Sequence, residues 1–505
     1  MNENSEISIE ENWIKLRDEY FGSRPIVIAA NRAPVVFEYS PDGELVYTRG
    51  AGGLVTALSA LAQYLPATWI ACARTEADVD WGEGEVEITE GYTINVKFIN
   101  PSEEAFEGYY NVIANPLLWF LQHSMWDLPR FPVINKKTWE AWEGGYKEVN
   151  RMFAAAIVKF SLNSDERPLV MLQDYHLYLA SNYINELQSK KHLPSLMHFT
   201  HIPWPGPEYW RILPPTMRQE ILEGMCKIDL LGFQTKEDSL NFLRTIETFL
   251  PRASTNYTRQ RTWYRNHATY IRDFPISIDV DGLRKIAESE QVTNYREEIE
   301  RTAESYSLIV RVDRIDPSKN IKRGFQAFEE MLNLHPEHRG KVQFLAILVP
   351  SRLEVSEYQE TLDELMTVVG RVNAVFSEED WEPIRVIINE NYPRALAALQ
   401  IYDVLLVNSI ADGMNLVAKE GPVINQRDGV LILSERTGAR QQLGPAALVI
   451  APCDVYATAE ALHQALKMPD EKRHEDAKLL RWMIEREDIT MWLINQLQGV
   501  QELGL

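Results

Sequence analysis

Short apolar runs alternate with longer segments of helical periodicity along the whole 505-residue chain. Runs without polar alternation are typical of parallel strands buried on both faces, and the helical segments between them predict a doubly wound α/β architecture. In the first half the runs span 24–32, 67–73, 92–100, 168–176, 196–203 and 230–235. In the second half they span 307–314, 342–350, 384–390, 404–409, 429–435 and 447–452.

The chain is too long for one ordinary hydrophobic core, so we expect two domains. The segment FPISIDVDG (274–282) is punctuated by Pro and Gly and marks the boundary. We therefore expect an N-terminal Rossmann-like domain over 1–275 and a C-terminal one over 276–484, with the helical tail 485–505 packed on the first. Ligands bind beyond the carboxyl ends of such strands, so a cleft between the two sheets is the expected site.

The composition of the chain argues against some classes of binding partner and favours one cellular compartment. The net charge of −22 argues against a nucleic-acid or anionic-membrane surface. The polar, acidic N-terminus is unlike a signal peptide, and no apolar run has the length of a membrane span. Cys72, Cys226 and Cys453 show no metal-ligand spacing. We expect reduced thiols in a cytoplasmic protein.

The strongest local signal is the segment DGMNLVAKE (412–420), which follows an apolar run. Gly413 permits close approach of the backbone to a ligand, and the residues after it resemble the first turns of a helix, whose amino end suits phosphate. Asp412 can accept hydrogen bonds from sugar hydroxyls, and Glu420, about two turns inside the helix, from a ribose. The alternative is an ordinary loop–helix junction.

A second signal is RVDRIDPSKN (311–320), between an apolar run and an amphipathic segment. Arg314 and Lys319 in this loop can neutralise a diphosphate, including the charge that develops on its leaving oxygens. The alternative is two solvated surface charges.

Weaker signals lie mainly in the first half. The alternative for each is a structural role, because a lone histidine at a strand end is more often a hydrogen-bonded structural group and aromatic residues often belong to the hydrophobic core. The candidates are Arg32 after the first run, Gly53 in the loop GAGGL, Tyr110, Trp119, Asp174, His201 and, in the second half, Arg352.

Together these residues resemble the trehalose-6-phosphate synthases over about residues 24–470. The most specific segment is DGMNLVAKE. The others are NRAP (31–34), GAGGL (50–54), YYN…LLW (109–119), DYHL (174–177), HIPWP (201–205), GFQT (232–235), FPISID (274–279), R-x-D-P-S-K (314–319) and LILSE (431–435). The resemblance implies two Rossmann-like domains in the GT-B arrangement. It also implies transfer of glucose from a nucleotide sugar, UDP- or GDP-glucose, to glucose 6-phosphate with retention of configuration.

The resemblance also implies roles for individual residues. Arg314 and Lys319 would hold the donor diphosphate together with backbone around Asn415, Leu416 and Val417. Asp412 would hold donor-sugar hydroxyls, Glu420 the ribose, and Gly53 would line the donor site. His201 would contact the transferred glucose, and Asp174 the acceptor hydroxyls. The acceptor phosphate would be held by Arg32, Tyr110, Trp119 and Arg352.

The implied mechanism needs no cofactor and no metal, because the leaving phosphate helps to deprotonate the incoming hydroxyl while two cations stabilise it. Substrates would be the only small-molecule partners, with a homo-oligomer and a separate downstream phosphatase as family-level expectations.

Several positions depart from the usual family pattern: Pro317, Asn320, Trp204, Tyr209 and Trp210. They are similar to variants in pseudo-glycosyltransferases, which join a cyclitol nucleotide to an aminocyclitol phosphate. The alternatives are therefore such an enzyme, a glucosylglycerol-phosphate synthase, or a catalytically silent regulatory homologue. UDP, GDP and ADP donors are not separated by the sequence.

Overall fold

The computed structural model describes residues 20–22, 24–49, 67–89, 91–188, 193–303, 306–352, 356–378 and 380–505. It contains two compact units, and each is described by itself. Unit 1 comprises Met1–Pro275 and Thr490–Leu505, and unit 2 comprises Ile276–Ile489.

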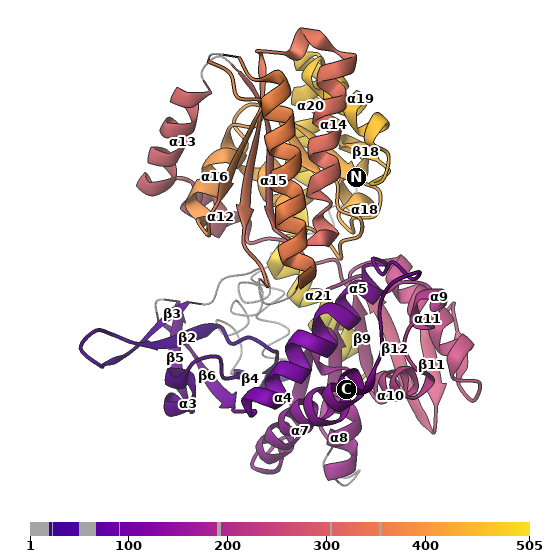
Figure 1. The fold of residues 1–505 in the computed structure, drawn as a ribbon. Coiled ribbons are helices and arrows are strands. Elements are labelled where there is room, and N and C mark those ends of the chain that lie inside the picture. The colour runs from indigo at the N-terminus through magenta and orange to yellow at the C-terminus, as the bar shows by residue number, and fades with distance from the viewer. Residues whose placement is uncertain are drawn as a thin grey trace, which may run out of the picture. The chain divides into compact units, whose positions relative to one another are not determined.

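Unit 1 is built on one ten-stranded sheet (Figure 1). Its strands in spatial order are β10 (Ser254–Asn256), β11 (Arg261–Tyr264), β12 (His267–Asp273), β9 (Leu230–Phe233), β8 (Ser195–Phe199), β7 (Leu169–Gln173), β1 (Ile26–Ala29), β4 (Ala67–Cys72), β6 (Tyr92–Ile99) and β5 (Glu83–Thr89). All neighbours from β12 to β6 pair in parallel, whereas β10, β11 and β5 add antiparallel edges. In chain order the parallel part reads 3-2-1-4-5-6-7, so the order reverses between β1 and β7.

The other elements of unit 1 connect these strands. A small hairpin is formed by β2 (Val35–Tyr39) and β3 (Leu45–Arg49). The helices are α3 (Glu76–Trp81), α4 (Glu103–Glu107), α5 (Trp119–Gln122), α6 (Lys136–Glu140), α7 (Lys147–Leu162), α8 (Ala180–Leu187), α9 (Pro207–Trp210), α10 (Pro215–Met225), α11 (Lys236–Phe249) and α21 (Ile489–Glu502). Two π-helical segments, η3 (Gly108–Leu118) and η4 (Ala141–Tyr146), and the 3-10 turn η5 (Tyr175–Leu177) complete the unit.

The C-terminal helix α21 belongs to unit 1 from Thr490 onward. The indole N–H of Trp492 donates to the carbonyl of Phe274 at 3.1 Å, and its ring packs edge-on against Phe199 with centroids 5.3 Å apart. Leu493, Ile494, Leu497 and Val500 are fully buried. Burial of an apolar helix face of this size is the main source of stability for such a docked helix.

Unit 2 is a six-stranded, wholly parallel sheet. Its strands in spatial order are β15 (Ile384–Ile388), β14 (Val342–Val349), β13 (Ser307–Arg314), β16 (Val404–Val407), β17 (Val430–Ser434) and β18 (Leu448–Ile450). In chain order this reads 3-2-1-4-5-6, the order of dinucleotide-binding folds, and it reverses between β13 and β16.

Helices cover both faces of this sheet, as a doubly wound fold requires. Apolar residues of α14 (Ile321–Leu334), α15 (Ser356–Phe376) and α19 (Val455–Leu466) form one core with the strands, and α14 and α15 lie side by side in Figure 1. The other helices include the mutually packed α12 (Val280–Ala287), α13 (Glu290–Thr302), α16 (Tyr392–Gln400), α17 (Val417–Ile424) and α20 (Asp470–Arg486). Short segments are α18 (Arg440–Leu443), η7 (Pro317–Lys319), η8 (Pro336–His338) and η9 (Gly444–Ala446).

The predicted α/β class with parallel, doubly wound sheets is confirmed. Every apolar run contains a strand. In the middle of the sheets these strands are buried on both faces, and β7, β8 and β17 are buried at all five positions. The runs did not predict β10 or β11, which lie at one edge of the sheet and are only partly buried. Among the described residues, no helix combines the length and apolar character needed to cross a membrane.

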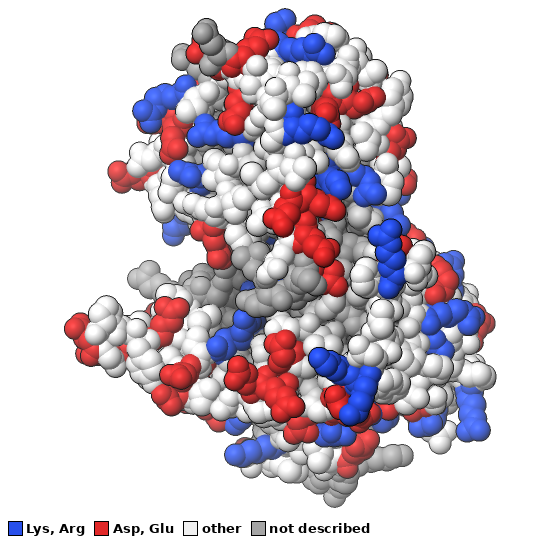
Figure 2. All heavy atoms as spheres, viewed as in Figure 1, with Lys and Arg blue, Asp and Glu red and all other residues white. Residues whose placement is uncertain are grey.

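Charge is mixed over the molecular surface in the view of Figure 2, with basic side chains interspersed among acidic ones. The chain as a whole is strongly acidic, with a net charge of −22. An anionic substrate therefore depends on a local group of cations rather than on a broad basic field.

Candidate active site

The predicted site residues gather where the strand order reverses in each sheet. In unit 2, Arg314 ends β13, and the segment from Asp412 follows β16, its neighbour in the sheet. In unit 1, Arg32 follows β1 and Asp174 follows β7, again neighbours. Open α/β sheets bind ligands at this point because the connections diverge to opposite faces and leave the strand ends open.

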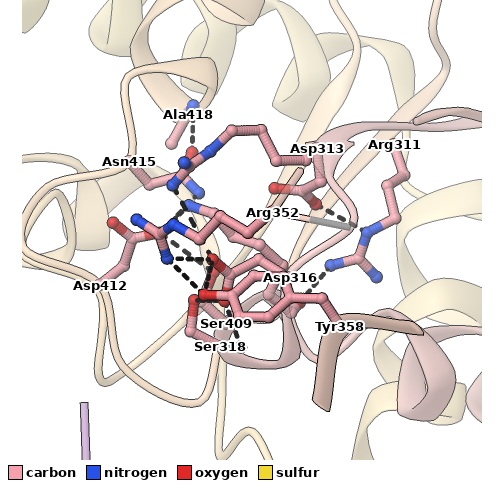
Figure 3. Close-up of polar contacts among 12 residues, drawn as sticks. Arg311, Asp313, Asp316, Ser318, Arg352, Tyr358, Ser409, Asp412, Asn415 and Ala418 are labelled. Carbon is pink, nitrogen blue, oxygen red and sulfur yellow. Dashed lines mark hydrogen bonds and ion pairs between the residues drawn. The ribbon is translucent and has the colours of Figure 1, made fainter. Parts of the chain in front are cut away.

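An ion pair joins the two strand ends of unit 2. The Lys319 ammonium donates to Oδ2 of Asp412 at 2.5 Å, and both side chains are largely buried. The same carboxylate oxygen accepts from Asn415 Nδ2 at 3.1 Å and Ser409 Oγ at 3.3 Å (Figure 3). The structure thus brings three predicted site residues, Lys319, Asp412 and Asn415, into one network.

A second network surrounds the fully buried carboxylate of Asp316. Its Oδ2 lies 4.0 Å from Arg314 Nη2, 3.5 Å from Arg352 Nη1 and 3.2 Å from the hydroxyl of Tyr358, which donates to it. The Arg352 guanidinium also bonds that hydroxyl. Two predicted cations therefore share one buried anion, with 44% of the Arg314 side chain left exposed. Arg352 belongs to unit 2, like Arg314 and Lys319.

The loop of Lys319 rests on a buried ion pair. Arg311 is fully buried; its Nε donates to Asp313 at 2.8 Å and its Nη2 to the carbonyl of Lys319 at 2.6 Å. Burial raises the pKa of Asp313, and the nearby Arg311 opposes that rise. Gly324 leaves the space for this guanidinium, because a Cβ there would lie 2.5 Å from Arg311 Nη1. The backbone position of Lys319 is therefore set from inside the unit.

The first turn of α17 differs from the expected geometry. Asn415 has a positive φ of 68°, so the helix begins only at Val417, after Leu416, and Asn415 Oδ1 accepts from the amide of Ala418 at 3.2 Å. Glu420 therefore lies in the first turn, and the expectation of two turns was wrong. Burial raises the pKa of Glu420 to about 7, and the hydroxyl of Tyr392 donates to it at 3.4 Å.

Sequence reasoning missed the segment that holds this loop from the other side. The amide of Asp412 donates to the carbonyl of Arg436 at 3.2 Å, and the amide of Gly438 donates back to Asp412 at 3.0 Å. A Cβ on Gly438 would lie 1.8 Å from the carbonyl oxygen of Gly413. The only sequence signal was this glycine after LILSE, because the contact joins backbones distant along the chain.

In unit 1, Asp174 and His201 are in direct contact. Asp174 has a φ of 67°, its Oδ1 accepts from the amide of His201 at 3.1 Å, and its own amide donates to Phe199 at 2.7 Å. Positive φ is costly for a residue with a Cβ and often marks a functional site.

The ring of His201 is neutral and oriented. Its Nε2 lies 3.0 Å from Oε1 of Gln173, an acceptor, so Nε2 bears the proton and Nδ1 has the lone pair. Burial, with the nearby His198, lowers the pKa of His201 to about 3. His201 can accept a hydrogen bond from a hydroxyl but is not a cation at neutral pH.

Aromatic rings surround the turn that follows β7. The ring of Tyr110 stacks on His176 with centroids 5.9 Å apart, and Trp119 tilts against Tyr175 at 5.7 Å. Both are largely buried. Arg32 is exposed, and its carbonyl accepts a hydrogen bond from the indole of Trp69 at 2.9 Å.

Arg74 is a cation that sequence reasoning missed. It follows β4, the sheet neighbour of β1, and its guanidinium lies 5.6 Å from the ring centroids of both Tyr110 and Phe106. Arg74 is exposed and forms no ion pair within the described part of the chain. The signal was its place after the run 67–73, which the same strand-end rule would have selected.

One predicted site residue, Gly53, and the positions that depart from the usual family pattern remain to be placed in the structure. Gly53 lies outside the described residues. Trp204 and Trp210 are fully buried and stacked with centroids 4.3 Å apart, and Trp204 bonds Asp238 through its amide at 2.7 Å. These two variants are core packing. Asn320 is explained by its φ of 57°, a left-handed geometry that suits Asn and Gly.

Comparison with known proteins gives one family over nearly the whole chain. The model of glycosyltransferase family 20 matches residues 24–502. The UDP-forming alpha,alpha-trehalose-phosphate synthase of Candida albicans is 33% identical over 471 residues, 92% of this chain and 95% of the relative. That of Schizosaccharomyces pombe is 31% identical over 485 residues, 95% and 91% of the two chains.

Solved structures are similar over the same extent. A trehalose-6-phosphate protein from E. coli bound with UDP-2-fluoro glucose has a TM-score of 0.81 at 27% identity, covering 95% of this chain and 98% of the other. A UDP-forming alpha,alpha-trehalose-phosphate synthase from Burkholderia xenovorans in complex with glucose-6-phosphate has a TM-score of 0.79 at 27% identity, covering 95% and 100%.

The left-handed position Asn320 gives a test of the loop that ends in Lys319. Its Nδ2 donates to the carbonyls of Asn408 at 2.9 Å and Pro452 at 2.6 Å. Asn320→Gly removes these bonds but keeps the left-handed geometry, whereas Asn320→Ala also adds a Cβ penalty of about 1–2 kcal/mol. We expect both variants to lose stability and Ala to lose more than Gly in urea denaturation. Equal midpoints for the two would contradict this account.

Proposed function

The chain belongs to glycosyltransferase family 20, and we propose that it is a retaining glucosyltransferase that moves glucose from UDP- or GDP-glucose to glucose 6-phosphate, giving trehalose 6-phosphate. One observation supports this most directly. In unit 2 the strand order reverses between β13 and β16, and at this point Lys319 forms an ion pair with Asp412, while Arg314 ends β13. The relatives named above support the nucleotide-sugar donor, and the Burkholderia complex supports the sugar-phosphate acceptor.

Unit 2 would bind the nucleotide sugar. The exposed guanidinium of Arg314 and the ammonium of Lys319 would contact the diphosphate, beside the amide groups around Asn415, Leu416 and Val417 at the positive end of α17. Asp412 would hold sugar hydroxyls while it orients Lys319. Glu420, in the first turn of the same helix, would accept from the ribose.

Unit 1 would supply the residues for the acceptor sugar. Asp174 would accept hydrogen bonds from its hydroxyls, and Arg32, Tyr110 and Trp119 would bind the phosphate, with Arg352 of unit 2 as a further cation. His201 would contact the transferred glucose, and its neutral ring fits acceptance from a hydroxyl.

The chemical step follows from this inventory. The bond from the anomeric carbon to the diphosphate oxygen breaks, and a bond to the acceptor hydroxyl oxygen forms on the same face. The hydroxyl proton passes to the departing phosphate oxygen, so no protein base and no metal is required. Arg314 and Lys319 stabilise the negative charge that develops on the leaving group. We also propose that no cofactor takes part.

The alternatives lose much of their support. Pro317 begins the turn η7, Asn320 takes a left-handed backbone geometry, and Trp204 and Trp210 fill the core. Backbone geometry and core packing therefore account for four of the five variants that suggested a cyclitol-coupling enzyme, Tyr209 being the exception, and no described residue favours a glucosylglycerol-phosphate synthase. A silent homologue would not need the intact Lys319–Asp412 pair.

Membership of the family also bears on the compartment, the oligomeric state and the reaction that follows. The three free cysteines fit a reducing compartment, which supports a cytoplasmic enzyme. We propose a homo-oligomer and a separate phosphatase that consumes the phosphorylated product.

The direct test offers UDP-, GDP- and ADP-glucose to the full chain, each with glucose 6-phosphate. We expect an α,α-linked disaccharide phosphate from at least one donor, identified by mass spectrometry and NMR. Glycerol phosphate and a cyclitol phosphate serve as competing acceptors. A product from those alone, or none at all, would refute the proposal.

Removing either diphosphate cation tests the donor site. Arg314→Ala or Lys319→Ala should lower kcat by roughly 10²–10³-fold, because each would stabilise charge that develops in the transition state. Lys322→Ala is the matched control, since Lys322 lies in the next helix and pairs only with the surface residue Glu364 among the described groups. Near-normal turnover of the Arg314 or Lys319 variant would remove that residue from the mechanism.

Arg74 extends the acceptor site beyond the predicted set. We propose that its guanidinium, placed over Tyr110, bonds the acceptor phosphate. Charge-assisted bonds to phosphate are strong, so Arg74→Ala should raise KM for glucose 6-phosphate by about 10-fold or more without changing KM for the nucleotide sugar. Arg151→Ala is the control, because Arg151 also stacks on a tyrosine, Tyr183, at 4.7 Å. Unchanged KM for the sugar phosphate would contradict the assignment.

A further inference from the structure

Three of the ten histidines of the chain lie together in unit 2. His335 follows α14, His338 ends η8, and His463 lies in the last turn of α19. The rings of His335 and His463 are nearly parallel, 11° apart, with centroids separated by 3.6 Å. None of these residues belongs to the site described above, and their clustering requires an explanation of its own.

One carboxylate lies near nitrogen atoms of both His335 and His463. Oε1 of Glu337 lies 3.9 Å from Nδ1 of His335 and 4.0 Å from Nδ1 of His463. His335, Glu337 and His463 each offer one ligand atom, and these three atoms all lie within 4.8 Å of one another. Nε2 of His338 faces Nδ1 of His463 at 2.9 Å, a separation at which two ring nitrogens share one proton or face one metal ion.

A further carboxylate orients His335. Oε1 of Glu460 lies 2.8 Å from Nε2 of His335 and accepts a hydrogen bond from it, which places the ring proton on Nε2 and leaves the lone pair on Nδ1, the atom that faces Glu337. A carboxylate behind the imidazole is the usual support of a metal-binding histidine, because it fixes the tautomer and makes the ligand more basic.

We propose that His335, Glu337 and His463 bind one zinc ion, with His338 next to the open fourth position. Two imidazoles and a carboxylate are ligands that Zn²⁺ prefers. With bonds of about 2.0–2.1 Å, tetrahedral ligands lie roughly 3.4 Å apart. Zinc binding would therefore draw these three side chains closer together and rotate the stacked rings of His335 and His463 so that a nitrogen lone pair of each faces the ion. His335 and His463 are partly exposed and Glu337 more so, which permits that adjustment.

The location indicates a stabilising role. The cluster precedes β14, at the amino ends of the parallel strands, whereas Lys319 and Asp412 follow strand carboxyl ends. A metal here would join the end of α14 to the end of α19, two helices that pack against each other. It would raise the stability of unit 2 by binding only the folded state, without entering the transfer reaction.

The test is a Zn²⁺ titration of the full chain after dialysis against a chelator, followed by calorimetry and thermal unfolding. We expect one ion per chain and a rise in Tm. His335→Ala and His463→Ala should each weaken binding by at least about 100-fold and abolish that rise. His474→Ala, which removes a histidine paired with Asp428 outside the cluster, is the matched control and should bind as the unaltered chain does.

Two more variants sharpen the result. Glu460→Gln, which only orients a ligand, should weaken binding by about 10-fold and keep the one-to-one stoichiometry. Cys453→Ser should have no effect, although Cys453 is an exposed thiol. Loss of binding in the Cys453 variant, unchanged binding in both alanine variants that fold to the same apo Tm, or no binding at micromolar Zn²⁺ would overturn the proposal. Glucosyl transfer is measured separately and is expected to persist without zinc.

Discussion

The ion pair between Lys319 and Asp412 depends on the strand order of unit 2. The two residues are 93 positions apart, yet they meet at 2.5 Å because β13 and β16 are neighbours whose connections leave in opposite directions. A sheet of another order would separate these strand ends. The network of Asn415 and Ser409 then holds the carboxylate, so the ammonium is oriented before any ligand binds.

Backbone geometry that most residues avoid occurs at predicted site residues in each of the two units. Asp174, Arg352 and Asn415 all have positive φ, as does Asn320 beside Lys319. Such positions persist only where surrounding bonds hold them, and here the bonds come from buried partners such as the carbonyls of Phe199 and Pro452.

The fold was largely predictable from the sequence, and the site was predictable in part. Strands buried on both faces can be predicted from sequence because burial excludes polar residues and leaves a continuous apolar run. The partly exposed strands β10 and β11 have no such run. Arg314 and Asp412 were found because they follow apolar runs. Arg74 was missed although it also follows an apolar run, because the rule was not applied to the run 67–73. Gly438 was missed because its significance depends on a backbone contact across the fold. Trp204 was misread as a substrate variant because its partner Trp210 becomes visible only in three dimensions.

The acids beside the cations explain how a chain of net charge −22 can hold phosphate groups. Asp316 lies between Arg314 and Arg352, and Asp412 forms an ion pair with Lys319. The two carboxylates offset the repulsion among the three cations, which can therefore lie close together. The five charges sum to +1, and Arg314 is the most exposed of the cations. On the proposed function, an arriving diphosphate would meet cations already fixed in place, and Arg314 would exchange the most water for phosphate oxygen on binding.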